Sequence, residues 1–551
     1  MTASHSMTVG RYLVQRLEQT GLQHIFGVPG DYVLSFFDYL EESSLQVVCN
    51  CNELNAGYAA DAYARLHGLG AVCVTFGVGG FSLFNAVMGA YAERVPMIII
   101  SGGPRTDTRS ENFHLHHTVR NKNLQQELFA RTTEAAVILD RAEAAPGQID
   151  AALAACLRSR RPVYLEIPLD MVACPCPPPG PWAVDTTLAS EPDTLAEALD
   201  ETVAMLAASQ NPVILAGIEA QRLGCSADLL ALAQHTGYPF ATTFLSKSML
   251  PEQHPQFAGV YGAALGSESA QALVESADLI LCLGTLFTDM ALGFGTAHLD
   301  PNRMVLANSD QVRIKHHTYA QVSLGDFIRG LLAQLPQGPP RRQAFIPAYQ
   351  GAETINHLPS RPLSNKGFYE RVNRFLDHRS LVLADTGDSI CAAAHLYLPE
   401  GSRYLCQGYY MSIGYTLPAA LGVKLAAPEY RPVIFIGDGA FQMTAQELST
   451  LIRNRLNPVI FLINNDGYTV ERVINDGPYN DLQPWQYHLL PQVFQGGWGM
   501  QVKTEADLEE ALAKAQNRPD ELAFIEVALA RLDCSEPLKK LAGIYQRNSV
   551  A

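Results

Sequence analysis

The sequence predicts an α/β fold made of three doubly wound parallel-sheet domains. The clearest observation is an apolar strand at 433–436 that runs into Gly437-Asp438-Gly439, followed by a helical stretch at 442–454 and a second apolar strand at 459–463. A strand–helix–strand unit of this length crosses over right-handed and leaves its strands parallel. Strand-then-glycine segments recur earlier in the chain, and two proline-rich stretches divide it into thirds. Each third therefore predicts one such domain.

The expected elements follow in order along the chain. They are strands 25–28, 71–75 and 97–100 with helices 32–40 and 53–66 in the first third, and strands 212–217 and 279–284 in the middle third. The proline-rich stretches 174–181 and 336–342 cannot continue a helix or a central strand, which indicates linkers. We therefore predict domains at 1–180, 181–342 and 343–551.

Composition limits the function classes. A length of 551 residues is too great for one hydrophobic core, and a net charge of −16 argues against a nucleic-acid partner. The longest apolar runs are far too short to span a membrane, and the first seven residues show no secretory signal. The eleven cysteines are scattered without zinc or redox spacing. We expect buried thiols in a reducing compartment and a cytoplasmic location.

Two polar residues follow the two strands of the strand–helix–strand unit at 433–463. Parallel strands end at one edge of a sheet, so Asp438 and Asn465 should lie side by side above a glycine turn that opens a helix. Such a turn binds phosphate, and hard oxygen ligands beside it suit Mg²⁺ held jointly with a diphosphate. An ordinary βαβ turn capped by Asp and Asn is the alternative.

Two carboxylates in the first third are candidate acid–base groups. Asp31 follows a strand directly, where α/β sheets bind ligands, or else it is the N-cap of the helix at 32–40. Glu53 opens another helix, where a carboxylate also simply complements the helix dipole. The residues alone leave both alternatives open.

Histidines and a further acid complete the candidates. His114, His116 and His117 lie in a polar segment, either as surface residues or as metal ligands. No Cys or carboxylate stands at zinc spacing, which argues against a metal. Glu471 opens a short helix just after the proposed Mg²⁺ loop, and its nearness to Asn465 makes it a candidate.

Taken together, these stretches resemble the thiamine-diphosphate-dependent 2-oxo-acid decarboxylases, the group of pyruvate, indolepyruvate and phenylpyruvate decarboxylases. The matching strings are Phe26-Gly-Val-Pro-Gly-Asp31, Asn52-Glu53-Leu-Asn-Ala-Gly-Tyr-Ala-Ala60, Thr75-Phe-Gly-Val-Gly-Gly80, His116-His117, Gly437-Asp438-Gly439 with Asn464-Asn465, and Gly467-Tyr-Thr-Val-Glu471. They span nearly the whole chain in the family's order. The Gly-Asp-Gly/Asn-Asn motif marks all thiamine-diphosphate enzymes, and the paired histidines with Glu471 narrow the resemblance to the decarboxylases.

The resemblance implies thiamine diphosphate and Mg²⁺ as cofactors. Asp438, Asn465 and the Gly467 carbonyl would hold the metal. Glu53 would bond the pyrimidine ring, Ile413 would wedge between the two rings, and the Met411 carbonyl would accept from the amino group. The full set of implied contacts is Glu53, Thr386, Asp388, Met411, Ile413, Asp438, Gly439, Ala440, Asn465, Gly467, Tyr468 and Val470. The domains at 1–180 and 343–551 would then bind the pyrimidine and the diphosphate.

The resemblance also implies the reaction, which is non-oxidative decarboxylation of a 2-oxo acid to an aldehyde and CO2 through an enamine on the cofactor. The implied catalytic residues are Asp31, Glu53, His116, His117 and Glu471. Active sites between two subunits are implied as well, hence a homodimer or homotetramer.

The substrate pocket would contain Met290, Thr386, Ile390, Val470 and Ile474, and the pairs 386/390 and 470/474 have helical spacing. Pyruvate-preferring bacterial relatives tend to carry a large aromatic residue in place of Ile390, Ile in place of Val470 and Tyr in place of Met290. We therefore expect branched, long-chain or aryl 2-oxo acids to be preferred over pyruvate. Pyruvate decarboxylase proper is the alternative.

Three other functions fit the sequence less well. An acetohydroxyacid synthase-like carboligase would lack the paired histidines. A non-catalytic binding protein on the same scaffold would have lost some of the acid–base groups, all of which are present. An NAD-dependent dehydrogenase would need a G-x-G-x-x-G turn followed by a ribose-binding acid, which does not appear in place.

Overall fold

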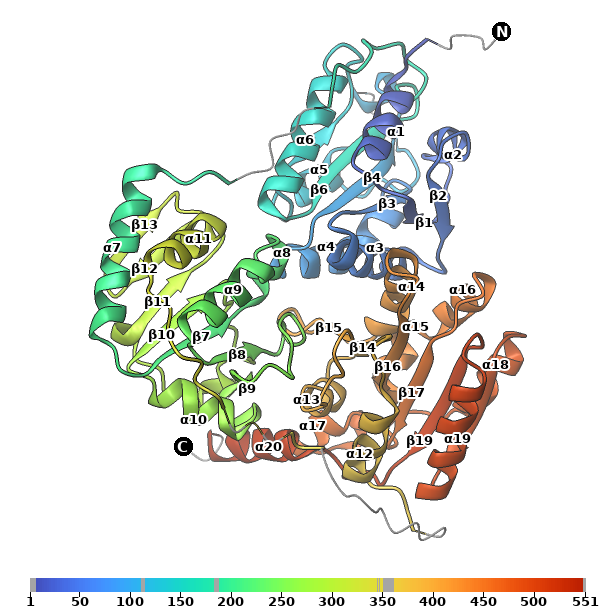
Figure 1. Ribbon diagram of the computed structural model, residues 1–551. Coiled ribbons are helices and arrows are strands. Elements are labelled where there is room, and N and C mark those ends of the chain that lie inside the picture. Colours follow the sequence, from blue (N-terminus) through green and yellow to red (C-terminus); the bar gives the residue numbers. More distant parts are fainter. Residues whose placement is uncertain are drawn as a thin grey trace. The chain divides into compact units, whose positions relative to one another are not determined.

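The computed structural model of the protein describes residues 6–110, 114–182, 188–343, 345, 347–349 and 361–548. Three sheets form, each from one region of the chain (Figure 1). By its contacts the chain divides into two units. The first unit comprises Met1–Thr187 with Leu417–Pro428 and Gln446–Asn454, and the second comprises the remainder. The domain limits near 180 and 342 stay predictions.

The first sheet belongs to the first unit and is wholly parallel, in the order β2-β1-β3-β4-β6-β5. Its strands are β1 (His24–Gly27), β2 (Gln46–Cys49), β3 (Gly70–Val74), β4 (Met97–Gly103), β5 (Ala136–Ile138) and β6 (Val163–Pro168). Its helices are α1 (Val9–Gln19), α2 (Leu34–Glu41), α3 (Glu53–His67), α4 (Val78–Ala92), α5 (Leu124–Phe129) and α6 (Ala145–Ser159). β3 and β4 are buried along their whole length, as the apolar strands of a sheet covered on both faces must be.

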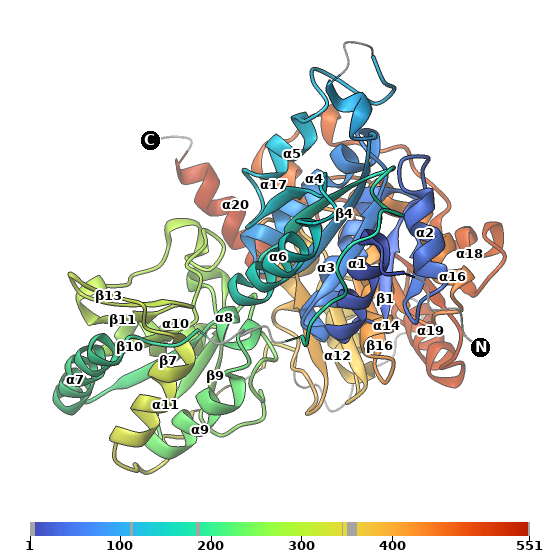
Figure 2. The ribbon, with the colours of Figure 1, turned by 90° about the horizontal axis from the view of Figure 1, so that it is seen from above.

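The central sheet has the order β13-β12-β11-β10-β7-β8-β9. Its strands are β7 (Pro212–Ala216), β8 (Phe240–Thr243), β9 (Phe257–Tyr261), β10 (Leu279–Leu283), β11 (Met304–Ala307), β12 (Gln311–Ile314) and β13 (His317–Ala320). Its helices are α7 (Pro192–Ala208), α8 (Ile218–Arg222), α9 (Ser226–Thr236), α10 (Glu268–Ser276) and α11 (Leu324–Gln334). Alternate strand residues face two separate cores, one covered by α7, α9 and α11 and the other by α10 (Figures 1 and 2).

The central sheet is mostly parallel, as predicted, but it is antiparallel at one edge. β12 and β13 pair antiparallel at one edge. The connections among β11, β12 and β13 are only a few residues long, so no crossover helix can reverse the chain, and the strands must run antiparallel. β12 alternates exposed and buried residues, which fits an edge strand covered on one face.

The third sheet is parallel in the order β15-β14-β16-β17-β19-β18, which repeats the order of the first sheet (Figure 1, orange to red). Its strands are β14 (Ser380–Ala384), β15 (Arg403–Cys406), β16 (Arg431–Gly437), β17 (Val459–Asn464), β18 (Trp498–Val502) and β19 (Ala523–Ala528). The helices of this region are α12 (Asn365–Phe375), α13 (Asp388–Ala393), α14 (Thr416–Ala426), α15 (Asp438–Thr444), α16 (Leu448–Arg453), α17 (Thr469–Ile474), α18 (Leu490–Val493), α19 (Glu505–Asn517) and α20 (Glu536–Asn548).

The helix predicted at 442–454 is in fact interrupted. α15 begins at Asp438, directly after the glycine turn, and a 3₁₀ turn at Ala445–Glu447 separates it from α16. Across the part of the chain that the structure describes, no helix is long and apolar enough to span a bilayer.

Candidate active site

The carboxyl edge of the third sheet brings two predicted ligands close together in the fold. β16 and β17 are adjacent and parallel, as predicted, so Asp438 and Asn465 follow neighbouring strands at one edge. The Asp438 carboxylate accepts hydrogen bonds from the N–H of Gly439 (2.8 Å) and the N–H of Gly467 (3.0 Å). The side chain is therefore fixed toward the turn after β17.

The electrostatics of this edge favour a cation. Burial, with a smaller contribution from the nearby Asp466, raises the pKa of Asp438 to about 6, against the opposing N–H groups of Gly467, Gly439 and Asn465. A buried carboxylate beside a second acid gains stability from a positive charge. The carboxylate of Asp438, the amide oxygen of Asn465 and the carbonyl of Gly467 are hard oxygen donors, which fits Mg²⁺.

Glycine is required at two positions of this turn. A Cβ on Gly439 would lie 2.4 Å from the ring of Tyr468. Gly467 has φ +135°, a conformation that residues with a side chain rarely adopt. The Gly-Asp-Gly motif and the glycine after the two asparagines thus have a local structural reason.

A cavity of about 350 Å³ opens at this edge. Most predicted cofactor and pocket residues line it, namely Met290, Thr386, Asp388, Ile390, Met411, Ile413, Asp438, Gly439, Ala440, Asn465, Gly467, Tyr468, Val470 and Glu471. The Thr386 hydroxyl is buried and has no hydrogen-bond partner among the described residues. Since buried hydroxyls normally have a partner, this one fits a polar group of a bound cofactor.

The residues that line the cavity differ in part from those predicted. Ile474, the last residue of α17, does not line the cavity. Thr386 precedes α13, so the pair Thr386/Ile390 does not share a helix face, although both residues line the cavity. Sequence analysis missed the apolar wall residues Phe294, Tyr369, Leu538 and Leu541. They come from distant segments, and no motif marks them.

Asp388 uses its side chain for structure. Its carboxylate accepts from Asn365 Nδ2 (2.9 Å), from the Ser535 N–H (3.1 Å) and from the Ser535 hydroxyl. Burial raises its pKa to about 6. The side chain ties the start of α13 to α12 and to the segment before α20, so a contact with a cofactor would have to come from the backbone.

Asp385, which sequence analysis missed, holds the loop that carries Met411 and Ile413. Its carboxylate accepts from the N–H groups of Gly414 (3.0 Å) and Thr416 (2.9 Å) and from the Thr416 hydroxyl (2.7 Å). Burial raises its pKa to about 6. The signal was available, because Asp385 directly follows β14 just as Asp438 follows β16.

The first unit brings three predicted catalytic residues together. His116 Nε2 lies 2.6 Å from Asp31 Oδ2, and ligand atoms of Asp31, His116 and His117 all lie within 4.8 Å of one another. His117 Nδ1 lies 3.1 Å from the Phe76 carbonyl, and His117 has φ +66°. The N-cap alternative for Asp31 is wrong, because α2 begins at Leu34. His114 is exposed outside this cluster.

A buried network lies behind the histidines. The Arg109 guanidinium donates to Glu166, whose other oxygen accepts from the Tyr164 hydroxyl (2.7 Å). Gln125 donates to that hydroxyl (2.7 Å) and accepts from the Gly77 N–H (2.7 Å). A Cβ on Gly77 would lie 2.5 Å from the carbonyl of His117, so this glycine packs directly against the histidine.

Glu53 is the first residue of α3, and an unpredicted acid holds the turn before it. The buried Glu447 accepts from Asn50 Nδ2 (2.8 Å), Asn55 Nδ2 (2.8 Å) and the Cys51 N–H (3.2 Å). Asn52 caps α3 by accepting from the Asn55 N–H. The first-turn position of Glu53 keeps the dipole alternative open.

Three domain families match the chain, and together they define a class of protein. They are the thiamine pyrophosphate enzyme N-terminal TPP binding domain at 7–132, the central domain at 199–335 and the C-terminal TPP binding domain at 385–527. The fold and the acid-rich sheet edge are thus those of a thiamine pyrophosphate enzyme.

Similar whole proteins narrow the class further. Pyruvate decarboxylase 4 of Arabidopsis thaliana is 37% identical over 98% of this chain and 91% of its own length. A probable pyruvate decarboxylase of Schizosaccharomyces pombe is 35% identical over 97% of this chain and 96% of its own length, and pyruvate decarboxylase 1 of Zea mays is 37% identical over 96% and 89%. The chain belongs to the thiamine-diphosphate-dependent 2-oxo-acid decarboxylases. It is a carboxy-lyase whose cofactor is thiamine diphosphate.

Proposed function

We propose that the enzyme prefers branched, long-chain or aryl 2-oxo acids over pyruvate and converts them to an aldehyde and CO2. The observation that carries this proposal is the composition of the cavity wall. Ile390 and Met290 are buried there beside Val470, and none of the three is a large ring that would shorten the pocket. Leu538 and Leu541 continue the apolar wall, which suits a substrate with a bulky apolar group.

The residues that would hold the cofactor are those at the sheet edge. Asp438, Asn465 and the Gly467 carbonyl would bind Mg²⁺ and so anchor the diphosphate, with the Thr386 hydroxyl as a further donor. Glu53 would bond the pyrimidine ring. Thiamine diphosphate, when bound, supplies the electron sink that accepts the bonding electrons as CO2 leaves.

The chain's own acid–base groups would move the protons. Asp31 and His116 form a hydrogen-bonded pair at 2.6 Å, which can pass one proton between a carboxylate and an imidazole. His117, held by the Phe76 carbonyl, would be the second donor to the product side. Glu471, in the cavity wall, would protonate the carbon that loses CO2.

The assembly proposal is a homodimer or homotetramer with active sites between subunits. Exposed apolar side chains support it, with Val78 and Met443 each 55% exposed and Val493 66% exposed. Analytical ultracentrifugation of the cofactor-loaded chain tests it, and a monomer would contradict it.

None of the eleven cysteines forms a disulfide, which favours a reducing compartment such as the cytoplasm.

The alternative substrate is pyruvate itself, which the names of the similar proteins favour. The variant Ile390→Trp separates the two, because an indole ring in the wall would fill the space for a bulky group. We expect the ratio of kcat/KM on phenylpyruvate to that on pyruvate to fall by about tenfold or more. Ile474→Trp is the matched control and should leave the ratio nearly unchanged, since Ile474 does not line the cavity. An unchanged ratio in Ile390→Trp would overturn the pocket assignment.

A further inference from the structure

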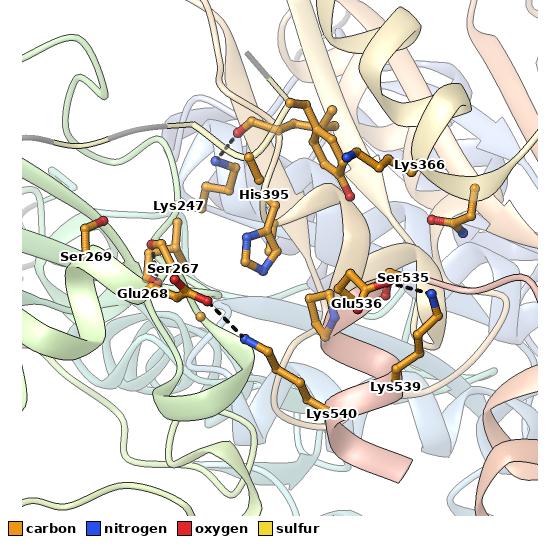
Figure 3. A pocket seen from close by; sticks show the side chains of 18 of the residues that line it. Lys247, Ser267, Glu268, Ser269, Lys366, His395, Ser535, Glu536, Lys539 and Lys540 are labelled. Carbon is orange, nitrogen blue, oxygen red and sulfur yellow. Dashed lines mark hydrogen bonds and ion pairs between the residues drawn. The ribbon is translucent and has the colours of Figure 1, made fainter. Parts of the chain in front are cut away.

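A cluster of titratable side chains lines a cavity of about 700 Å³ in the second unit (Figure 3). Four lysines of this wall are matched by four acids, namely Lys247, Lys366, Lys539 and Lys540 with Glu252, Glu268, Asp533 and Glu536. His395 is neutral, because burial lowers its pKa to about 4, and its Nε2 lies 3.0 Å from the Leu265 carbonyl. This cavity therefore offers a ligand no net charge.

The cluster of Asp31, His116 and His117 in the first unit differs from it, because it is open to solvent. One ligand atom of each residue lies within 4.8 Å of those of the other two. The side chains of Asp31 and His116 are each 57% exposed. Among the described residues, the ion-pair partner of Asp31 is His116, and no Lys or Arg pairs with it. The carboxylate is therefore open to a cation from solution.

His117 makes the hydrogen bond that metal-binding histidines usually make. Its Nδ1 lies 3.1 Å from the carbonyl oxygen of Phe76. Because a carbonyl oxygen can only accept, Nδ1 carries the proton of the neutral ring, and Nε2 keeps its lone pair. A carbonyl on the far nitrogen fixes both the tautomer and the orientation of a ligating histidine. His117 is thus prepared to bind an ion through Nε2.

The backbone of the two histidines is held in place by its surroundings. His117 has φ +66°, and a Cβ on Gly77 would lie 2.5 Å from its carbonyl oxygen. The ring of His116 lies against the ring of the buried Tyr32, with centroids 4.7 Å apart, and the Tyr32 hydroxyl donates to the His116 carbonyl (3.3 Å). Ligands that are ordered beforehand lose less conformational entropy when they bind.

The donor set suits a zinc-type ion better than Mg²⁺. Two imidazole nitrogens and one carboxylate oxygen are common Zn²⁺ ligands, whereas Mg²⁺ prefers oxygen. Zn²⁺ bonds of about 2.0–2.2 Å place neighbouring ligand atoms about 3.3 Å apart, which exposed side chains can reach by small rotations. Asp31 stands 85 residues before His116, so no spacing in the sequence reveals it as the third ligand.

We propose that Asp31, His116 and His117 bind one divalent transition-metal ion of the zinc type, and that this ion inhibits the enzyme. The ion takes the place of the proton that Asp31 and His116 share at 2.6 Å, and His116 then carries its proton on Nδ1. The pair can no longer pass a proton, so turnover stops until the ion leaves. The inhibition rests on the proposed role of these residues in proton transfer, whereas the binding does not.

Calorimetric titration of Zn²⁺ into untagged enzyme, loaded with thiamine diphosphate and excess Mg²⁺, tests the binding. The excess Mg²⁺ keeps the site at Asp438 filled. We expect the wild type to bind one Zn²⁺, and the double variant His116→Ala/His117→Ala to bind it at least about tenfold more weakly. Co²⁺ added instead of Zn²⁺ should show the visible absorption of a four-coordinate site in the wild type only. Circular dichroism checks that the variant folds.

His316→Ala/His317→Ala is the matched control. It removes another pair of adjacent, exposed histidines, of which His317 has its Nδ1 2.8 Å from Glu201. Among the described residues, no third His, Cys or acid joins that pair at ligand distance. The control should therefore bind Zn²⁺ as the wild type does.

Inhibition is measured as CO2 release in the same excess of Mg²⁺. The Zn²⁺ concentration that halves the activity of the wild type should equal the Kd from the titration, and a zinc-selective chelator should restore the activity. The control variant should be inhibited in the same way.

Three results would overturn the proposal. Equal Zn²⁺ affinity in both double variants, or Zn²⁺ that is lost in Asp438→Asn instead, would overturn the site. Zn²⁺ bound at the cluster with full activity would overturn the inhibition. The proposed proton transfer fails separately if His116→Ala/His117→Ala decarboxylates at the rate of the wild type, since this is measured without Zn²⁺.

Discussion

Asp388 shows how a residue marked by a motif can serve a different purpose from the expected one. It lines the cofactor cavity, but its carboxylate is bonded to Asn365 and Ser535. Its buried position raises its pKa to about 6, from an ordinary value of about 3.9. The residue is therefore a joint between α12, α13 and α20, and its charge costs stability.

This cost predicts a pH dependence of stability. The folded-state pKa is raised, so the stabilisation from protonating Asp388 is complete below about pH 4 and is lost as the pH rises through about 6. In cofactor-free protein, the Tm of the wild type should fall relative to Asp388→Asn between pH 5 and pH 7. Scanning calorimetry of both proteins at a series of pH values measures this difference in Tm.

Asp193→Asn, at an exposed position, is the matched control and should follow the wild type at every pH. If the Tm of the wild type and the Tm of Asp388→Asn change in parallel with pH, the Asp388 carboxyl does not titrate between pH 5 and pH 7. The comparison isolates Asp388, because Asp385 and Asp438, whose pKa values are also raised to about 6, are present in both proteins.

The site residues that lie in short motifs could be predicted from the sequence. The residues that hold those motifs in place could not. Asp438 and Asn465 could be placed because strand ends of a βαβ unit must meet. Glu447 could not, because its partners Asn50 and Asn55 are distant in sequence and no spacing links them. Leu538 of α20 is missed for the same reason.

At the scale of elements, the segment after β4 is anchored by one buried ion pair. Arg109 lies in a 3₁₀ turn (Asp107–Ser110), a few residues before the paired histidines, and bonds Glu166 of β6. Arg109 also donates to the Lys122 carbonyl (3.0 Å) and to Asn123 (2.7 Å). One guanidinium thus holds both ends of the histidine segment to the sheet.

Breaking this anchor should displace the histidines. We predict that Glu166→Gln costs on the order of 3 kcal/mol of stability, because it leaves a partly buried guanidinium without its charge partner. kcat should fall about tenfold while the KM of the 2-oxo acid changes less, and hydrogen exchange at the Gly77 N–H should accelerate. Steady-state kinetics and exchange mass spectrometry measure both effects.

Glu134→Gln is the control for this pair. Glu134 lies 3.9 Å from Arg161 in a surface pair, which is worth little. If Glu166→Gln loses stability but keeps the kcat and the pH profile of the wild type, the network stabilises the fold and does not position the histidines.

The elements themselves were predicted best where the pattern was longest. Continuous apolar strands such as β16 and β17 were found because burial on both faces demands them. The break between α15 and α16 was missed, since it depends on the tertiary contacts of Glu447 rather than on local propensity. The β12–β13 hairpin was missed because its short strands give no apolar run.

At the scale of the whole molecule, the chain repeats one sheet topology at its two ends and places a different sheet between them. The terminal domains belong to two families that are both TPP binding domains. Because the cofactor binds the folded chain and not the unfolded chain, we expect the free energy of unfolding to rise with the cofactor concentration.

Product formation by protein stripped of cofactor and then reloaded tests whether the chain is a thiamine-diphosphate-dependent decarboxylase. CO2 and aldehyde from phenylpyruvate should appear in equal amounts only when thiamine diphosphate and Mg²⁺ are both restored, and Asp438→Asn should abolish both the recovery and the binding of thiamine diphosphate. Bound cofactor with no CO2 from any 2-oxo acid would show that the chain is not a decarboxylase, and undiminished activity in Asp438→Asn would show that Asp438 does not hold the cofactor's metal.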